Sequence, residues 1–187
     1  MPRYAPSVRP DIRWRIRVKN DTAIPLAAAP MTGAMSNLLI AHVVLSLVGL
    51  VAGIVVLRCL FLSRVPAVLA AVFLLATVAT SVSGFLFPIT RIGLGQVVGG
   101  VSLIVLLPTL LALYVHHLVG PWRWIFAAGS TAALYLNGVI GVAQAFAKVA
   151  ILNAIAPTHT APLFLSAQLA LLLAFVGMGA RAVVMFH

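Results

Sequence analysis

Five long apolar runs dominate the chain, at residues 38–57, 67–87, 97–115, 124–147 and 163–184. Each run holds roughly twenty residues, which is the length a helix needs to cross a hydrocarbon core of ~30 Å. Backbone groups find no water inside a bilayer, so a run of this kind crosses it as a helix. The short connections predict one all-α integral membrane bundle of five transmembrane helices. A bundle of four spans, with one run partly in the interface, is the alternative.

Polar residues inside these runs recur at helical spacing. In the fourth run they are separated by 7, 4, 3 and 4 positions, at Ser130, Asn137, Gly141, Gln144 and Lys148. In the first run the spacings are 4, 3 and 4, at His42, Ser46, Gly49 and Gly53. Residues spaced in this way share one helix face. Each run therefore carries one polar stripe.

Polar groups that face lipid are costly, so the stripes are expected to face each other inside the bundle. Hydrogen-bonding side chains of the five runs also fall at one level of the membrane. The candidate pocket residues are His42, Ser46, Thr80, Ser81, Gln96, Asn137, Gln144, Lys148 and Gln168. We expect Gln144 to lie near His42, and Lys148 to lie at the rim of the same pocket.

Structural roles compete with the pocket for the same residues. Ser, Thr and Gly positions such as Gly49 and Gly53 form the small-residue surfaces through which membrane helices approach closely. Asn137 and Gln144 would serve equally as hydrogen bonds between helices. Lys148 ends its run, where a lysine side chain extends to the interface.

Composition supports a membrane protein, since 63% of the 187 residues are hydrophobic, 7% are charged, and the mean hydropathy is +1.18. A soluble domain has too little polar surface to cover so many apolar side chains. The net charge of +10 is unevenly distributed, because six of the twelve basic residues lie in the first nineteen positions. Both acids, Asp11 and Asp21, also lie in this leader.

The leader, residues 1–34, is expected to be a disordered basic extension. Met35 is an alternative start of the protein, and a cytoplasmic arm that touches anionic lipid is the other interpretation. If the chain crosses the membrane five times, four arginines lie on one side of the membrane and two basic residues on the other. The larger group is Arg58, Arg64, Arg123 and Arg181, and the smaller is Arg91 and Lys148. The positive-inside rule then places the larger group in the cytoplasm.

Several chemistries are excluded or weakened by what the runs lack. No carboxylate follows Asp21, which removes carboxylate proton relays, acid–base pairs and hydrolytic metal sites. Cys59 is the single cysteine, so there is no disulfide or thiolate metal cage. The glycine-rich segment 93–100 has neither the preceding strand nor the Lys-Ser/Thr ending of a phosphate loop. Nucleic-acid binding would depend on the leader alone and is not expected.

Three strings carry a resemblance to a known family: TSVSGFLFP at 80–88, LYLNGVIGVAQAFAKV at 134–149 and APTHTAPLF at 156–164. They resemble a family of small uncharacterised bacterial inner-membrane proteins, which typically begin where this chain has Met35. The resemblance covers about residues 35–186 and implies a multi-pass protein of the bacterial inner (plasma) membrane, without implying an activity. Relatives often have a histidine where Gln96 aligns and a glutamate where this chain has Ala161.

These observations predict a non-enzymatic membrane protein with a polar intramembrane pocket. It would bind a small lipophilic or polar molecule, or serve as an accessory subunit of a larger membrane complex. The alternative is a redox protein that holds haem b or quinone at His42. A pair of histidine haem ligands is disfavoured, because His116 and His117 lie near the other membrane face and His159 lies in a loop. A small transporter is a third possibility, weakened by the lack of acids and of an internal repeat.

Overall fold

The structure is a computed structural model that describes residues 33–87 and 93–186. Within these ranges the chain is helical and forms no strand. The all-α bundle predicted from the sequence is confirmed. The leader predicted to be disordered lies outside the described residues as far as residue 32.

Five of the described helices are long and apolar enough to cross a membrane, in agreement with the five runs. They are α1 (Gly33–Leu60), α2 (Ala67–Gly84), α3 (Leu94–Leu110), α4 (Trp122–Lys148) and α6 (Pro162–Met185). Beyond Pro108, α3 continues as the π-helix η2 (Leu111–Val115), so the two together make the third span. The short helix α5 (Ala150–Ile155) was not predicted, and it lies between α4 and α6.

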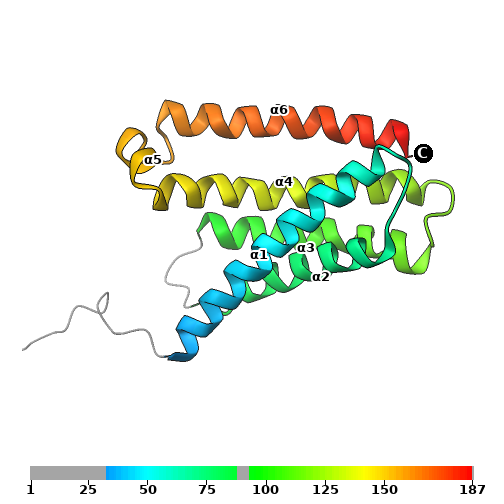
Figure 1. Ribbon diagram of the computed structural model, residues 1–187, viewed down its shortest axis with the longest axis horizontal. Coiled ribbons are helices and arrows are strands. Elements are labelled where there is room, and N and C mark those ends of the chain that lie inside the picture. Colours follow the sequence, from blue (N-terminus) through cyan, green and yellow to red (C-terminus); the bar gives the residue numbers. More distant parts are fainter. Residues whose placement is uncertain (1–32, 88–92, 187) are drawn as a thin grey trace, which may run out of the picture. The chain divides into compact units, whose positions relative to one another are not determined.

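The first four long helices form a ring. Helix α1 packs against α2 and α4, and α3 packs against the same two helices, so that α2 and α4 lie diagonally across the ring. Helix α6 lies outside this ring along α4 and makes few contacts with α1 (Figure 1). Successive helices run in opposite directions, as five crossings with short connections require.

Helix α1 approaches its neighbours most closely at two glycines. A Cβ atom at Gly49 would lie 3.3 Å from Thr77 Oγ1, and one at Gly53 would lie 2.7 Å from both Leu134 Cδ1 and the Phe73 ring. Small residues permit this approach. All the buried residues of α1 lie from Gly49 onward, whereas the helix before Gly49 is half-buried or exposed. Figure 1 shows why, since α1 crosses the other helices diagonally and its first half extends away from α4.

The large apolar core fills only one half of the ring. It comprises residues from the second half of α1, the first half of α2, the end of the third span, the first half of α4 and the end of α6. Its largest fully buried side chains are Phe73, Phe126, Leu60, Leu74, Leu106 and Leu134. In the opposite half, the buried side chains at the end of α2 are polar: Thr77, Thr80, Ser81 and Ser83.

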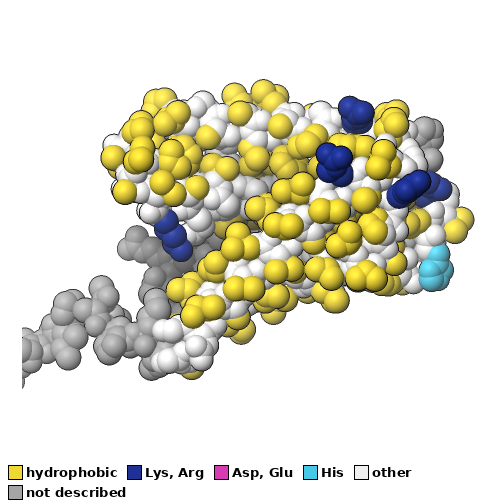
Figure 2. Space-filling view, in the orientation of Figure 1, with side chains coloured by type: hydrophobic (Ala, Val, Ile, Leu, Met, Phe, Trp, Pro, Cys, Tyr) yellow, Lys and Arg dark blue, Asp and Glu magenta, His cyan; other side chains and the backbone are white. Residues whose placement is uncertain are grey.

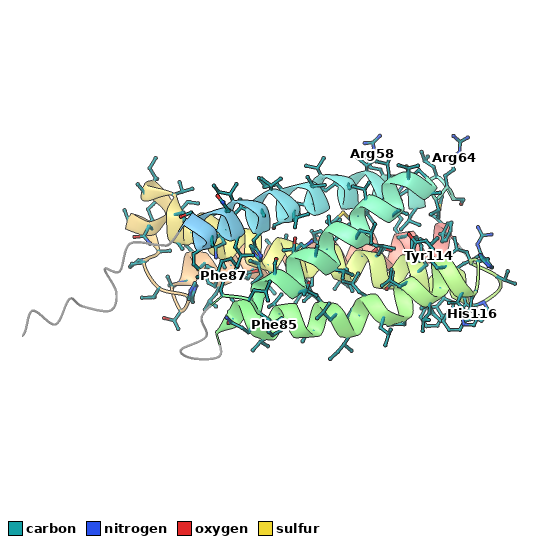
Figure 3. All side chains as sticks on the ribbon, turned by 90° about the horizontal axis from the view of Figure 1, so that it is seen from below. Arg58, Arg64, Phe85, Phe87, Tyr114 and His116 are labelled. Atoms are coloured by element: carbon teal, nitrogen blue, oxygen red, sulfur yellow. The ribbon has the colours of Figure 1, made fainter. Side chains whose placement is uncertain are left out.

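Arginines gather at the end of the bundle that contains this core. Figure 3 shows Arg58 and Arg64 at the same end as Tyr114 and His116, while Phe85 and Phe87 lie at the other end. Most of the dark blue side chains on the face in Figure 2 gather at one end. Arg123 donates from Nε to the carbonyl oxygen of Phe186 (3.1 Å) and stacks over its ring at 4.6 Å.

The close approach at Gly53 generates the first prediction. Gly53→Ala should lower the free energy of unfolding by about 1–3 kcal/mol, because Phe73 and Leu134 are fully buried and cannot move away from the added methyl group. Reversible unfolding in mixed micelles, followed by circular dichroism, measures the change. Gly177→Ala in α6 is the matched control, since its Cβ would have no atom within 4 Å. Equal stability of the two variants would contradict the packing described here.

Candidate functional site

The two polar stripes predicted from the sequence do meet inside the ring. A Cβ atom at Gly49 would lie 3.6 Å from Asn137 Nδ2, so the stripe of α1 and the stripe of α4 are in contact at this level. Asn137 donates from Nδ2 to Thr77 Oγ1 across the ring, at 3.4 Å. The Thr77 hydroxyl in turn donates to the carbonyl oxygen of Phe73 at 2.8 Å. The Asn137 amide is therefore held in hydrocarbon by a hydrogen-bonded chain that joins α4 to α2.

Nearer the end where α1 begins, the stripe of α1 continues to His42. Its Nδ1 lies 2.8 Å from Ser83 Oγ, and the Ser83 hydroxyl donates to the carbonyl oxygen of Thr80 at 3.0 Å. Which of the two atoms donates depends on the imidazole tautomer. A Ser83 hydroxyl that donates to the Thr80 carbonyl has only its lone pairs left for His42, and this arrangement requires the ring proton on Nδ1. The other nitrogen, Nε2, then carries a lone pair. The Phe87 ring packs edge-on against the imidazole at 5.4 Å.

Along α4, the same helix face passes from buried to uncovered. Ser130 is 3% exposed and Asn137 is half-buried, whereas Gly141, Gln144 and Lys148 are exposed. A Cβ atom at Gly141 would have no atom of the described residues within 4 Å. The face that points into the ring at Asn137 still points that way one and two turns later. Beyond Asn137 this face of α4 is thus not covered by the other described helices, and we call the region between it, the start of α1 and the end of α2 the polar half.

A buried hydroxyl without a partner lies in the polar half. Thr80 is 8% exposed, and its Oγ1 makes no hydrogen bond to any described residue. It lies on α2 one turn beyond Thr77, three residues before Ser83. An unsatisfied buried hydroxyl costs about 1–3 kcal/mol, so a group that bonds to Thr80 Oγ1 would be favoured.

The structure shows no hydrogen bond between Gln144 and His42. The partner of His42 is Ser83 on α2, and Gln144 is exposed with no hydrogen bond within the described part of the chain. Lys148 ends α4 and is exposed.

Two other glutamines are engaged elsewhere. Gln96 turns back to accept, at Oε1, a hydrogen bond from the Gly93 backbone N–H (3.0 Å), so it caps α3. Gln168 donates from Nε2 to the carbonyl oxygen of Val139 at 3.1 Å and attaches α6 to the outer side of α4. Neither side chain converges on His42, so the predicted cluster from five helices is reduced to α1, α2 and α4.

The remaining two candidates lie where helices pack. Ser81 is buried, and its carbonyl oxygen would lie 3.5 Å from a Cβ at Gly99, at the contact of α2 with α3. Ser46 is half-buried on the stripe of α1, between His42 and Gly49, and within the described ranges its hydroxyl makes no hydrogen bond.

Sequence reasoning missed an apolar groove between α4 and α6. Its volume is about 570 Å³, and its walls are small and aliphatic side chains with the rings of Tyr135 and Phe175. The groove opens on the outer surface of the bundle and not into the polar half. Spacing alone could not reveal it, because small residues such as Gly179 are equally typical of tight packing.

Metal ligands do not cluster in the described part of the chain. Within residues 33–87 and 93–186, no group of three His, Cys, Asp or Glu side chains is close enough to hold an ion. His116 stacks on Trp122 at the arginine end, and His159 packs against Phe164 beyond α5. His42 therefore offers a single ring nitrogen to any ligand of the polar half.

Comparisons of the chain with protein-family models, with curated proteins and with solved structures give no match. The resemblance of the three motifs to small inner-membrane proteins accordingly stays a prediction from the sequence. The five helices are consistent with a multi-pass membrane protein.

The two amides of the α4 stripe generate the second prediction. Asn137→Ala should destabilise the protein by about 0.6–1.7 kcal/mol, because it removes the hydrogen bond to Thr77. Gln144 lies on the same helix face as Asn137, two turns further along. Gln144→Ala should leave stability unchanged, since the Gln144 amide has no described partner. The same mixed-micelle unfolding experiment compares them. A larger loss for Gln144→Ala than for Asn137→Ala would overturn the assignment of both residues.

Proposed function

We propose that this membrane protein binds a small lipophilic or amphiphilic molecule in the polar half of its four-helix ring. The observation that carries the proposal is the loss of cover along one face of α4, from buried Ser130 to exposed Gly141. A face that points into a bundle and yet has nothing against it leaves room for a ligand. Pockets between bundle helices with a few convergent polar groups are the usual small-molecule sites.

The chemistry of the polar half supports an amphiphilic ligand. Its hydrogen-bonding groups are the lone pair of His42 Nε2, the Thr80 hydroxyl and the exposed Gln144 amide, with the Lys148 ammonium at the rim. The sequence has no carboxylate beyond Asp21, so a bound cation would find no counter-charge there. The ligand is thus neutral or anionic, with an apolar body that lies between α1 and α4.

A redox protein that binds quinone or haem b at His42 is the second candidate. The hydrogen bond from Nδ1 to Ser83 supports it, because a histidine that ligates a metal or receives a proton is commonly oriented through its other nitrogen. The other described histidines make no contact with His42, which disfavours a haem with two histidine ligands. Neither group is needed for the leading proposal.

The test of the leading proposal uses Gly141→Leu, a side chain that fills the open space. Protein extracted with its surrounding lipid into nanodiscs is analysed by native mass spectrometry for a bound molecule of low mass. We expect occupancy to fall on the order of tenfold in the variant, equivalent to ~1.4 kcal/mol of lost binding. Gly177→Leu, at an equally open glycine on α6, is the control and should retain the ligand.

The outcomes separate the candidates. A protein that carries no small molecule, or one that both variants retain equally, would refute binding in the polar half. A Soret band in the absorption spectrum that disappears in His42→Phe would establish the haem alternative. Co-purification of another membrane polypeptide, lost in Gly141→Leu alone, would instead indicate an accessory subunit whose partner covers the polar half.

We also propose an orientation, in which the arginine end faces the cytoplasm of a bacterium and the polar half opens toward the outer leaflet. Arg58, Arg64 and Arg123 at one end support it through the positive-inside rule. After replacement of Cys59 by Ser, a cysteine at Thr158 should react with an impermeant maleimide added to intact spheroplasts. Cysteines at Ser63 and Val119 should react only after lysis. Labelling of Val119→Cys and Thr158→Cys from the same side would refute the arrangement.

A further inference from the structure

The hydrogen bonds of His42 restrict which ligands it can accept. Ser83 Oγ lies within hydrogen-bond distance of both His42 Nδ1 and the Thr80 carbonyl oxygen, and we infer that its proton goes to the carbonyl, so that His42 donates from Nδ1. Nothing within the described ranges pairs with an imidazolium cation, because the sequence has no carboxylate after Asp21. In hydrocarbon an unpaired charge is strongly disfavoured. The ring is thus a neutral imidazole with a fixed tautomer, whose Nε2 accepts and cannot donate.

The Nε2 atom belongs to a half-buried side chain at the start of the polar half. His42 is half-buried on the α1 face that contacts Asn137 and Thr77 further along, and within the described ranges Nε2 has no hydrogen bond. If the hydrocarbon begins near Arg58 and spans about twenty residues of α1, His42 lies about 6 Å inside the opposite boundary. A head group at the interface can therefore contact this nitrogen while its apolar part extends into the ring.

We propose that His42 makes the polar half selective for a hydroxyl donor, such as a phenol, a quinol or a lipophilic alcohol. This inference rests on the proposed binding function and specifies the class of its ligand. A ligand hydroxyl donates to Nε2, whereas a ketone, quinone or ether oxygen at the same position places one lone pair against another. Sites built around a hydrogen bond to a hydroxyl reject the analogue that lacks it, because a buried group is then left unpaired.

Ser83 acts as a positioning residue in this arrangement. Its own proton is engaged by the Thr80 carbonyl, so it can only accept from His42, and this fixes the proton on Nδ1. Removal of its hydroxyl frees the imidazole to place its proton on either nitrogen. The Ser83→Ala protein should then accept both donors and acceptors at Nε2. Selectivity, and not affinity for apolar molecules, is the property that should change.

The experiment compares 4-octylphenol with its methyl ether, 4-octylanisole, in which a methyl group replaces the proton offered to Nε2. Both are titrated against the protein in phosphatidylcholine nanodiscs, with protein-free nanodiscs to correct for partition into lipid. We expect the wild type to bind the phenol about tenfold more tightly than the ether. The phenol makes one hydrogen bond to Nε2, whereas the ether leaves that buried nitrogen unpaired. The ratio should fall towards one in Ser83→Ala and in His42→Phe.

A second measurement separates tautomer from fold. Nitrogen-15 spectra of protein labelled at histidine distinguish a protonated Nδ1 from a protonated Nε2, and His42→Phe identifies the resonance. The Nδ1–H tautomer is expected in the wild type and a mixture in Ser83→Ala. Thr109→Val in α3 is the control, because the Thr109 hydroxyl bonds to the Val105 carbonyl of its own helix beside the packed core, and this variant should retain both the tautomer and the ligand preference.

Each result has one meaning. If neither compound binds above protein-free nanodiscs, the proposed function and this inference both fail. If both bind equally to the wild type, the hydroxyl selectivity fails while the proposed function stands. A preference for the phenol that survives in Ser83→Ala would refute the role of Ser83. A preference seen in the wild type and Thr109→Val, and lost in Ser83→Ala and His42→Phe, supports the inference.

Discussion

The close approach of α1 to α2 and α4 at Gly49 and Gly53 is the contact on which the rest of the structure depends. A helix that touches two neighbours at one point, through residues without side chains, must diverge from them on either side unless larger side chains fill the gap. On one side Phe73, Leu134 and their neighbours fill it. On the other side the adjacent residues are polar, and no apolar cluster of comparable size is found there among the described residues. The crossing point thus divides the ring into a packed half and a polar half.

Hydrocarbon makes every polar side chain seek a partner within the chain, and the structure shows how unevenly this is achieved. Asn137 and His42 are both held by hydroxyls of α2, and those hydroxyls are held by backbone carbonyls one turn earlier. Helix α2 therefore provides the hydroxyl groups to which the polar side chains of α1 and α4 bond. Thr80, between these two anchors, is left without a partner. An incomplete network next to an uncovered helix face is the physical basis for placing a ligand there.

The elements were predictable because membrane helices need only length and low polarity. The five runs agree with the five long helices to within a few residues at most ends, and the helical spacing of the α4 stripe correctly indicated that Asn137 faces inward. The site was predicted less well, because the position of a residue along its span indicates its depth in the membrane but not which side chains of other helices it contacts. Gln96 and Gln168 lie at the expected depth, but their hydrogen bonds go elsewhere. Gln96 accepts from the Gly93 backbone N–H and caps α3, and Gln168 donates to the Val139 carbonyl and attaches α6 to α4. The partner of His42 is a hydroxyl of α2 and not the Gln144 amide, and the spacing of polar residues along the helices does not determine such a choice.

The peripheral place of α6 has a consequence for biogenesis. The four helices of the ring are contiguous in sequence, and each packs on the one made before it, so the ring can close while α6 is still being synthesised. Helix α6 then docks on a finished surface, where the Gln168 amide reaches the Val139 carbonyl and Gly179 comes against Thr131. Until that moment the outer side of α4 is covered by lipid alone. The contacts of the ring thus allow the helices to pack in the order in which they are translated, with α6 added last.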